Sequence, residues 1–163
     1  MTGGVRIEAV SSGDWPGIVR LETESYAAKG LSERRSVLES RVRASPETCF
    51  VLRTGRHLAG YVLALPYPLF RFPAFDRPEG PAYTSGNLHL HDLVIARDRR
   101  GRGLAKVLLD RLIVTARSRR YDRMSLIAVA GSTAFWSANG FRPHPEVPVP
   151  GYGADAGYLS RAL

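Results

Sequence analysis

Residues 100–106 read Arg-Gly-Arg-Gly-Leu-Ala-Lys and stand between a predicted strand and the clearest predicted helix of the chain. Glycine lets the backbone approach a ligand closely and adopt conformations that other residues resist. The first turn of a helix offers unpaired N–H groups and a partial positive charge, which suit a pyrophosphate. Arginine side chains add charged hydrogen bonds to phosphate oxygens. The stretch therefore predicts a phosphate-binding turn; a plain helix start with glycines for tight packing is the alternative.

Two common phosphate-binding motifs do not fit this turn. A P-loop ends in Gly-Lys followed by Ser or Thr, and residues 100–106 contain no such ending. The dinucleotide fingerprint needs a third glycine where Lys106 stands, and no acidic residue follows at the required distance after the next strand. The spacing that remains is R-x-x-G-x-A, formed by Arg100, Gly103 and Ala105.

Strands and helices are predicted on both sides of the turn. Hydrophobic periodicity and turn residues predict strands over residues 5–10, 48–53, 58–65, 87–96, 124–130, 141–147 and 157–163. Helices are predicted from Asp14, from Ser32, over residues 104–117, and from Ser132 to Asn139. A chain of 163 residues suits one domain, and no linker divides it. We therefore predict a single α/β (α+β) domain over residues 1–163, with a mixed sheet flanked by helices.

Composition and charge limit the classes of function. The chain has no apolar run of membrane-spanning length, and its first residues lack the pattern of a signal peptide, so we expect a cytoplasmic protein without a membrane partner. The formal net charge of +8 favours anionic partners. Arginines cluster over residues 97–102 and 117–123 without the aromatic platform that single-stranded nucleic acid needs. We expect a phosphorylated cofactor rather than nucleic acid, and we expect no metal.

Two stretches of the chain resemble the GNAT family of N-acetyltransferases. Residues 90–103, LHDLVIARDRRGRG, resemble the strand and turn of that family. Residues 134–141, AFWSANGF, resemble its second signature, which usually has the form F-Y-x-x-x-G-F. The two stretches occur in the family's order with a predicted strand between them. The resemblance implies a mostly antiparallel, splayed GNAT sheet and acetyl-CoA as cosubstrate. The family often forms dimers, so a homodimer is one open alternative, and the sequence leaves the oligomeric state open.

The resemblance further implies which residues hold the cofactor. In the family, the strand's main chain pairs with the pantetheine arm and the turn holds the pyrophosphate. Carried onto this chain, the cofactor-binding residues are Leu93, Val94, Ile95, Arg100, Gly101, Arg102, Gly103, Leu104, Ala105, Lys106 and Trp136. Trp136 is a departure, because many members carry there a tyrosine that protonates the leaving thiolate, and indole cannot act as such an acid. Tyr152 or Tyr158 then supplies the proton, or the thiolate leaves unaided.

Three residues of the strand before the turn are candidates for proton transfer from the amine. His89 and His91 are two apart on one strand, so they are predicted to share a face, and histidine titrates in the range that a base needs. The segment Leu-His-Leu-His resembles that of arylalkylamine N-acetyltransferases, where two such histidines form a proton path. A half-solvated polar face is the alternative. Asp92 is predicted to point to the opposite face unless a bulge intervenes, as a second candidate base or a structural acceptor.

Residues 66–86 form a long connection rich in proline and aromatic residues. Such a connection is usually functional, and its aromatics either line a substrate pocket or pack on the surface. The predicted function is acetylation of a small-molecule primary amine. A protein or peptide acceptor, favoured by an open cleft, and a non-catalytic acetyl-CoA sensor are the alternatives.

Overall fold

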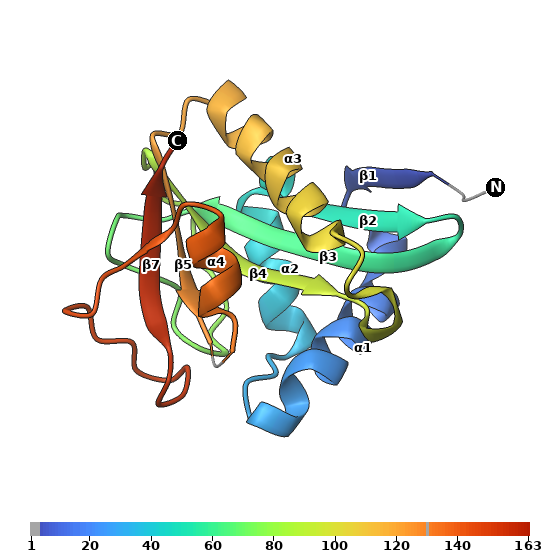
Figure 1. The fold of residues 1–163 in the computed structure, drawn as a ribbon, viewed down its shortest axis with the longest axis horizontal. Helices are drawn as coiled ribbons and strands as arrows, with labels where there is room; N and C mark the ends of the chain where they lie inside the picture. Colours follow the sequence, from blue (N-terminus) through green and yellow to red (C-terminus); the bar gives the residue numbers. More distant parts are fainter. Residues whose placement is uncertain (1–3, 130) are drawn as a thin grey trace.

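The strands form one mixed sheet in the order β1-β2-β3-β4-β5-β7-β6 (Figure 1). The computed structural model describes residues 4–129 and 131–163. Within them the strands are β1 Val5–Ala9, β2 Phe50–Thr54, β3 His57–Pro66, β4 Asn87–Ile95, β5 Arg123–Ala128, β6 Arg142–Pro143 and β7 Gly157–Ala162. Neighbouring strands are antiparallel except β4 and β5, which are parallel. The predicted fold class, a mixed and mostly antiparallel sheet with flanking helices, is confirmed.

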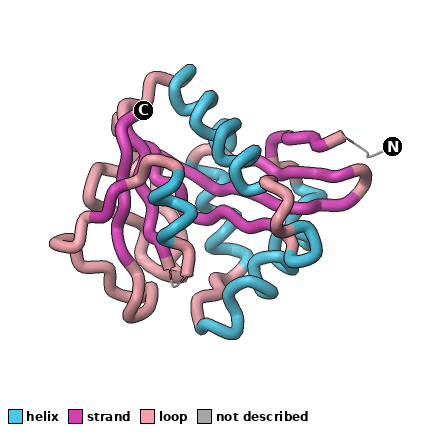
Figure 2. The backbone as a smooth tube through the Cα atoms, viewed as in Figure 1, coloured by secondary structure: helices cyan, strands magenta, loops and turns pink. Residues whose placement is uncertain are grey.

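The helices cover both faces of the sheet. They are α1 Trp15–Tyr26, α2 Arg35–Ala44, α3 Leu104–Ser118 and α4 Thr133–Ala138. In Figure 1, α1 and α2 lie on one face of the strands β2–β4 and α3 lies on the other. Figure 2 shows that loops gather around β5 and β7, whereas helices cover the N-terminal half of the sheet. None of the helices within the described residues is long and apolar enough to cross a membrane.

Two hydrophobic clusters hold these layers together. On the α3 face, buried Leu108, Leu109 and Leu112 pack with Leu88 and Leu90 of β4. On the opposite face, α1 and α2 contribute Ile18, Leu21 and Leu38, which pack with Tyr61, Leu63 and Val94. Each fully buried Leu or Ile side chain contributes about 1.5–3 kcal/mol of transfer free energy. Strand β4 lies between the two clusters, so its course through the core is fixed from both faces.

The sheet opens between β4 and β5. The parallel pairing joins only Asn87–Leu90 with Arg123–Leu126, although β4 continues to Ile95. In Figure 1 the two strands diverge beyond this point, and β5 and β7 run steeply across the direction of β3 and β4. The edge of β4 beyond Leu90 therefore faces an opening, which is the splay that the resemblance implied.

A β-bulge in β4 changes which way one predicted site residue faces. In the pairing with β3, Leu63 lies opposite Asp92 and Ala64 lies opposite Leu90, so His91 is the extra residue. A bulge of this kind places two successive side chains on one face. The sequence predicts that Asp92 faces away from the histidines unless a bulge intervenes. The bulge is present, so Asp92 lies on the same face as His91. The contacts of Asp92 with Tyr26 and Tyr61 lie on the α1 face.

Two predicted boundaries are also wrong. Helix α2 begins at Arg35 rather than Ser32, because the Ser32 hydroxyl and the Glu33 backbone N–H donate to the Glu22 carboxylate. The strand predicted over residues 141–147 shortens to Arg142–Pro143. Proline has no N–H to continue a ladder.

Candidate active site

A groove of about 670 Å³ lies where β4 and β5 diverge. Its floor includes Leu93, Val94 and Ile95 of β4, and its far wall is formed by Phe135 and Trp136 of α4. The turn before α3 forms one end, where Gly101, Gly103, Leu104, Ala105 and Lys106 line the groove. All but one of the residues predicted to hold the cofactor line this groove. The exception is Arg102, which belongs to the turn but is not a lining residue.

The turn before α3 has the backbone that an anion site requires. Gly101 and Gly103 have φ angles of 78° and 75°, in the left-handed region that favours glycine. A Cβ at either position would meet nothing within 4 Å, so glycine is needed for its conformation and not for space. Gly103 is the N-cap of α3, which directs the unpaired N–H groups of the first turn into the groove. The turn is therefore suited to phosphate oxygens.

Basic side chains surround the same end of the groove. Lys29, Arg97, Arg99, Arg100 and Lys106 line it. Arg100 has a structural task as well: its Nε donates to the Ile95 carbonyl at 3.0 Å and its Nη2 to the Ser25 hydroxyl at 3.3 Å. Arg100 thus ties the turn to the end of β4 and to α1. An unpaired strand edge, a glycine turn at a helix N-terminus and this positive charge together fit a coenzyme A nucleotide and its pantetheine arm.

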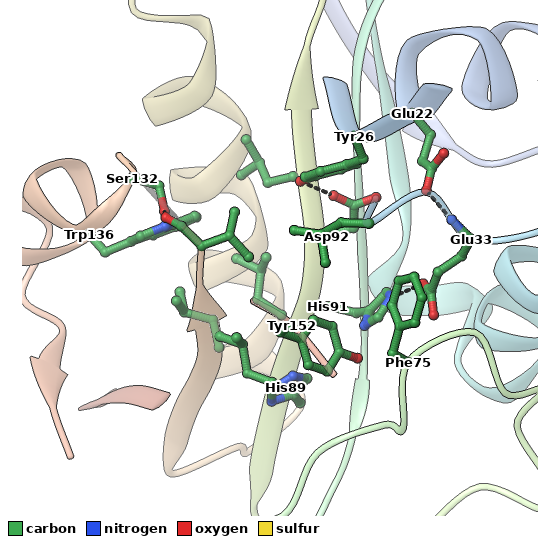
Figure 3. A pocket seen from close by; sticks show the side chains of 16 residues that line it. Glu22, Tyr26, Glu33, Phe75, His89, His91, Asp92, Ser132, Trp136 and Tyr152 are labelled. Atoms are coloured by element: carbon green, nitrogen blue, oxygen red, sulfur yellow. Dashed lines mark hydrogen bonds and ion pairs between the residues drawn. The ribbon is translucent and has the colours of Figure 1, made fainter. Parts of the chain in front are cut away.

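A second, smaller cavity of about 100 Å³ adjoins the groove. Tyr26, Leu93, Val129, Ser132 and Trp136 line both spaces. Only the small cavity is lined by His89, His91, Asp92 and Tyr152, the four residues predicted to be catalytic (Figure 3). The structure therefore brings these four side chains together next to the predicted acetyl position.

Two loops contribute aromatic side chains to the lining of the small cavity. Phe75, from the connection between β3 and β4, and Tyr152, from the loop before β7, both line it. Their rings pack edge to face with centroids 5.8 Å apart, and the Tyr152 hydroxyl donates to the Pro73 carbonyl at 2.7 Å. Burial, followed by the nearby Glu33, raises the pKa of Tyr152. Of the two open interpretations of residues 66–86, pocket lining and surface packing, the contacts of Phe75 favour the first.

His91 is held by a buried ionic network. Its Nε2 lies 2.5 Å from Glu33 Oε1, and Glu33 Oε2 accepts from Arg41 at 2.6 Å. Arg41 also pairs with Glu79 and is fully buried. Burial, and then the Arg41 cation, lower the pKa of His91, against the opposing effect of Glu33. Burial raises the pKa of Glu33, but its contacts with His91 and Arg41 outweigh this and leave that pKa below the ordinary value.

His89 is the more enclosed of the two histidines. Its Nδ1 lies 2.9 Å from Ser125 Oγ, and its ring stacks on Tyr158 with centroids 6.3 Å apart. Burial, then His91 and Arg41, lower its pKa well below the ordinary range. Burial thus lowers the pKa of both histidines, which favours the neutral form that accepts a proton.

Asp92 is buried between two tyrosines. Tyr26 donates to its Oδ1 at 2.7 Å and Tyr61 donates to its Oδ2 at 2.5 Å. Burial raises the pKa of Asp92 to about 7, with Glu22 and Glu33 adding to the rise, although the two hydroxyls stabilise the ionised form. Asp92 therefore changes protonation state near neutral pH, which is unusual for an aspartate.

Several of these residues were absent from the sequence predictions. Tyr26, Glu22 and Glu33 reach the site from α1 and from the segment before α2, and Arg41 supports it from α2. No periodicity or motif marks them. The nearest signal was Ser32-Glu33, which reads as a helix start but serves to hold Glu22 and His91.

Comparison with known proteins identifies one family and many solved structures with a similar fold. The model of the acetyltransferase (GNAT) family matches residues 15–141, most of the chain. Ard1 from Thermoplasma volcanium superposes with a TM-score of 0.79 at 16% identity, over 98% of this chain and 97% of that chain. The ribosomal-protein-S18-alanine N-acetyltransferase from Escherichia coli gives 0.71 at 15% identity, over 98% and 94%. No protein of curated function matches the sequence.

A third similar structure was solved with coenzyme A bound. The N-acetylglutamate synthase from Neisseria gonorrhoeae, in complex with coenzyme A and N-acetyl-glutamate, gives a TM-score of 0.75 at 19% identity. The superposition covers 98% of this chain but only 35% of that chain. At these identities the likeness is one of fold, and the acceptors named for these proteins differ from one another.

Proposed function

The chain belongs to the GNAT acetyltransferase family, and from the geometry of its site we propose that it transfers an acetyl group from acetyl-CoA to the primary amine of a small molecule. The observation that carries the choice of acceptor is the small cavity of about 100 Å³ beside the groove. Phe75 and Tyr152, whose rings pack on each other, line this cavity, and its small volume favours a small acceptor. A folded protein surface or an extended peptide needs a cleft with an open end.

The groove residues position the cosubstrate. The N–H groups of the turn from Gly101 to Lys106 bind the pyrophosphate, and the exposed edge of β4 from Leu93 to Ile95 pairs with the pantetheine arm. Bound there, the thioester supplies an activated acetyl group. The shared walls of the two cavities, which include Leu93 and Trp136, then hold the reacting carbon at the boundary between groove and acceptor pocket.

Side chains that line the small cavity provide the base that removes a proton from the acceptor amine. An alkylamine with a pKa near 10 is mostly protonated at pH 7, and forming the free base costs about 4 kcal/mol at 1.36 kcal/mol per pKa unit. His89 and His91 favour the neutral form and line the acceptor cavity, so one of them accepts this first proton. Glu33 orients His91 through Nε2 and stabilises the imidazolium that forms.

The acceptor class is tested by coenzyme A release with a panel of arylalkylamines, polyamines, amino acids and short peptides. We expect turnover with a small primary amine and none with peptides. Phe75→Ala removes one ring from the lining of the cavity and should extend the preference to bulkier amines. Phe70→Ala is the matched control, because Phe70 lies on the same loop, is 47% exposed and packs on His144 and Tyr158 without lining the cavity. Turnover confined to peptides, or tight acetyl-CoA binding without turnover, contradicts the proposal.

A further inference from the structure

The departing sulfur ends as the coenzyme A thiol, and Trp136 cannot supply the proton that it takes up. Among the described residues, two hydroxyl side chains line both the groove and the acceptor cavity, Tyr26 and Ser132. The Ser132 hydroxyl donates to the Val129 carbonyl at 2.8 Å. A backbone carbonyl has no proton that it could give back to the hydroxyl. Tyr152 lines only the acceptor cavity and donates to the Pro73 carbonyl. Among the described residues, Tyr26 is therefore the hydroxyl-bearing residue that lines both spaces and does not donate to a carbonyl.

The partner of Tyr26 distinguishes it from the other hydroxyls. Its O–H donates to Asp92 Oδ1 at 2.7 Å, as the dashed line in Figure 3 marks. In that view Tyr26 lies over β4, with Ser132 and Trp136 across the opening from it. A carboxylate, unlike a carbonyl, can take up a proton and hand it on. Asp92 also lines the acceptor cavity, where the amine nitrogen must sit.

We propose that Tyr26 and Asp92 form a proton relay from the amine nitrogen to the leaving sulfur, a proposal that rests on the acetyl transfer proposed above. The free amine attacks the thioester carbon, so a C–N bond forms and the C–S bond breaks with its electron pair on sulfur. One of the two protons on the attacking nitrogen passes to the Asp92 carboxylate, and the other stays on the amide product. The Tyr26 hydroxyl gives its proton to sulfur and takes the proton from Asp92. The products are the N-acetyl amine and the coenzyme A thiol, and both side chains return to their starting states.

The surroundings of the pair favour this relay over a lone tyrosine acid. Burial, and next the Asp92 charge, raise the pKa of Tyr26 well above its ordinary value, so a free phenolate is costly there. Proton return from Asp92 in the same step avoids that phenolate. The groups that face Asp92 are Tyr26, Tyr61 and the carboxylates of Glu22 and Glu33. Burial, with these carboxylates adding to the rise, brings the pKa of Asp92 to about 7, close to the pH at which it must both accept and release a proton.

The test compares two tyrosines that contact the same carboxylate. Tyr26→Phe and Tyr61→Phe each remove one hydroxyl that donates to Asp92, but Tyr61 is fully buried and lines neither cavity. The pKa of Asp92 is measured by ¹³C NMR of labelled aspartate and assigned with D92N. Both variants should raise that pKa, because each loses a hydrogen bond to the ionised form. Only Tyr26→Phe should lower kcat by about 10²-fold or more, the usual scale of general acid catalysis.

Calorimetric measurement of acetyl-CoA binding serves as the check that each variant retains its fold and groove. Equal losses of kcat in the two variants would mean that Tyr26 only tunes Asp92, and the relay is then rejected. Wild-type kcat in Tyr26→Phe rejects it as well. The unaltered protein distinguishes the two proposals: if it turns over no amine, the proposed function fails and the relay fails with it, whereas an active protein with an unaffected Tyr26→Phe variant refutes the relay alone.

Discussion

Replacing Arg41 by methionine tests how strongly the buried ionic network holds the site. The Arg41 side chain is 0% exposed, and its two partners, Glu33 and Glu79, are 4% and 9% exposed. Methionine keeps a similar apolar stem but leaves two buried carboxylates without their cation. Breaking a buried pair in this way costs about 3–5 kcal/mol, a large share of the roughly 5–15 kcal/mol by which a domain is stable.

The loss should depend on pH. The pKa of Glu33 is lowered in the folded protein, so its stabilising contribution is complete above the ordinary value of 4.5 and disappears as the pH falls through the folded pKa. Without Arg41, both carboxylates are easier to protonate, and protonation removes the uncompensated charge. The gap in unfolding free energy between wild type and Arg41→Met is therefore largest at neutral pH and narrows toward pH 4.

Urea unfolding followed by circular dichroism at pH 7 and near pH 4 measures this gap. Arg35→Met is the matched control, because Arg35 lies in the same helix and pairs with Glu39 at the surface, with side chains 51% and 31% exposed. Such a pair contributes less than about 1 kcal/mol. If Arg41→Met loses no more than Arg35→Met at pH 7, or if its deficit grows on acidification, the reasoning from buried charge is refuted.

Two further predictions concern the groove and the acid–base pair. Gly103→Ala should weaken acetyl-CoA binding by about tenfold or more in calorimetry. The left-handed φ of 75° costs a residue with a Cβ roughly 1 kcal/mol or more, and relieving this strain displaces the N–H groups of the turn. The control is Gly55→Ala in the turn between β2 and β3, which has a similar φ of 61° and should lose stability without losing affinity. The rate of acetyl transfer should rise as the pH passes through about 7, because Asp92 ionises there. Glu22→Gln should move this rise to lower pH, because it removes a negative charge that raises the pKa of Asp92. An unchanged pH–rate profile in this variant contradicts the prediction.

The cofactor half of the site could be predicted from local sequence because local backbone chemistry builds it. The glycines at 101 and 103, the apolar face of α3 and the preceding strand all lie within residues 87–118, and each has a recognised pattern. The groove residues follow from that order of strand, turn and helix. A phosphate-binding turn needs only that its N–H groups point one way, which a helix start ensures.

The acceptor half depends on contacts between distant segments. Tyr26 and Asp92 are 66 residues apart, and His91 and Glu33 are 58 apart, so neither pair leaves a pattern in the sequence. The bulge at His91, which turns Asp92 toward Tyr26, arises from the register between β3 and β4. A single extra residue reverses the alternation of a strand, and pairing in the folded sheet decides where that residue stands.

The sequence by itself determined the fold class, the glycine turn before α3 and the strand that bears the histidines, because periodicity and glycine positions act over a few residues. Only the tertiary structure decided that Phe75 and Tyr152 line the small cavity together, that Arg41 is buried between Glu33 and Glu79, and that Asp92 faces two tyrosines. Burial and the charges of distant neighbours set the protonation states that chemistry needs, and these exist once the chain has folded.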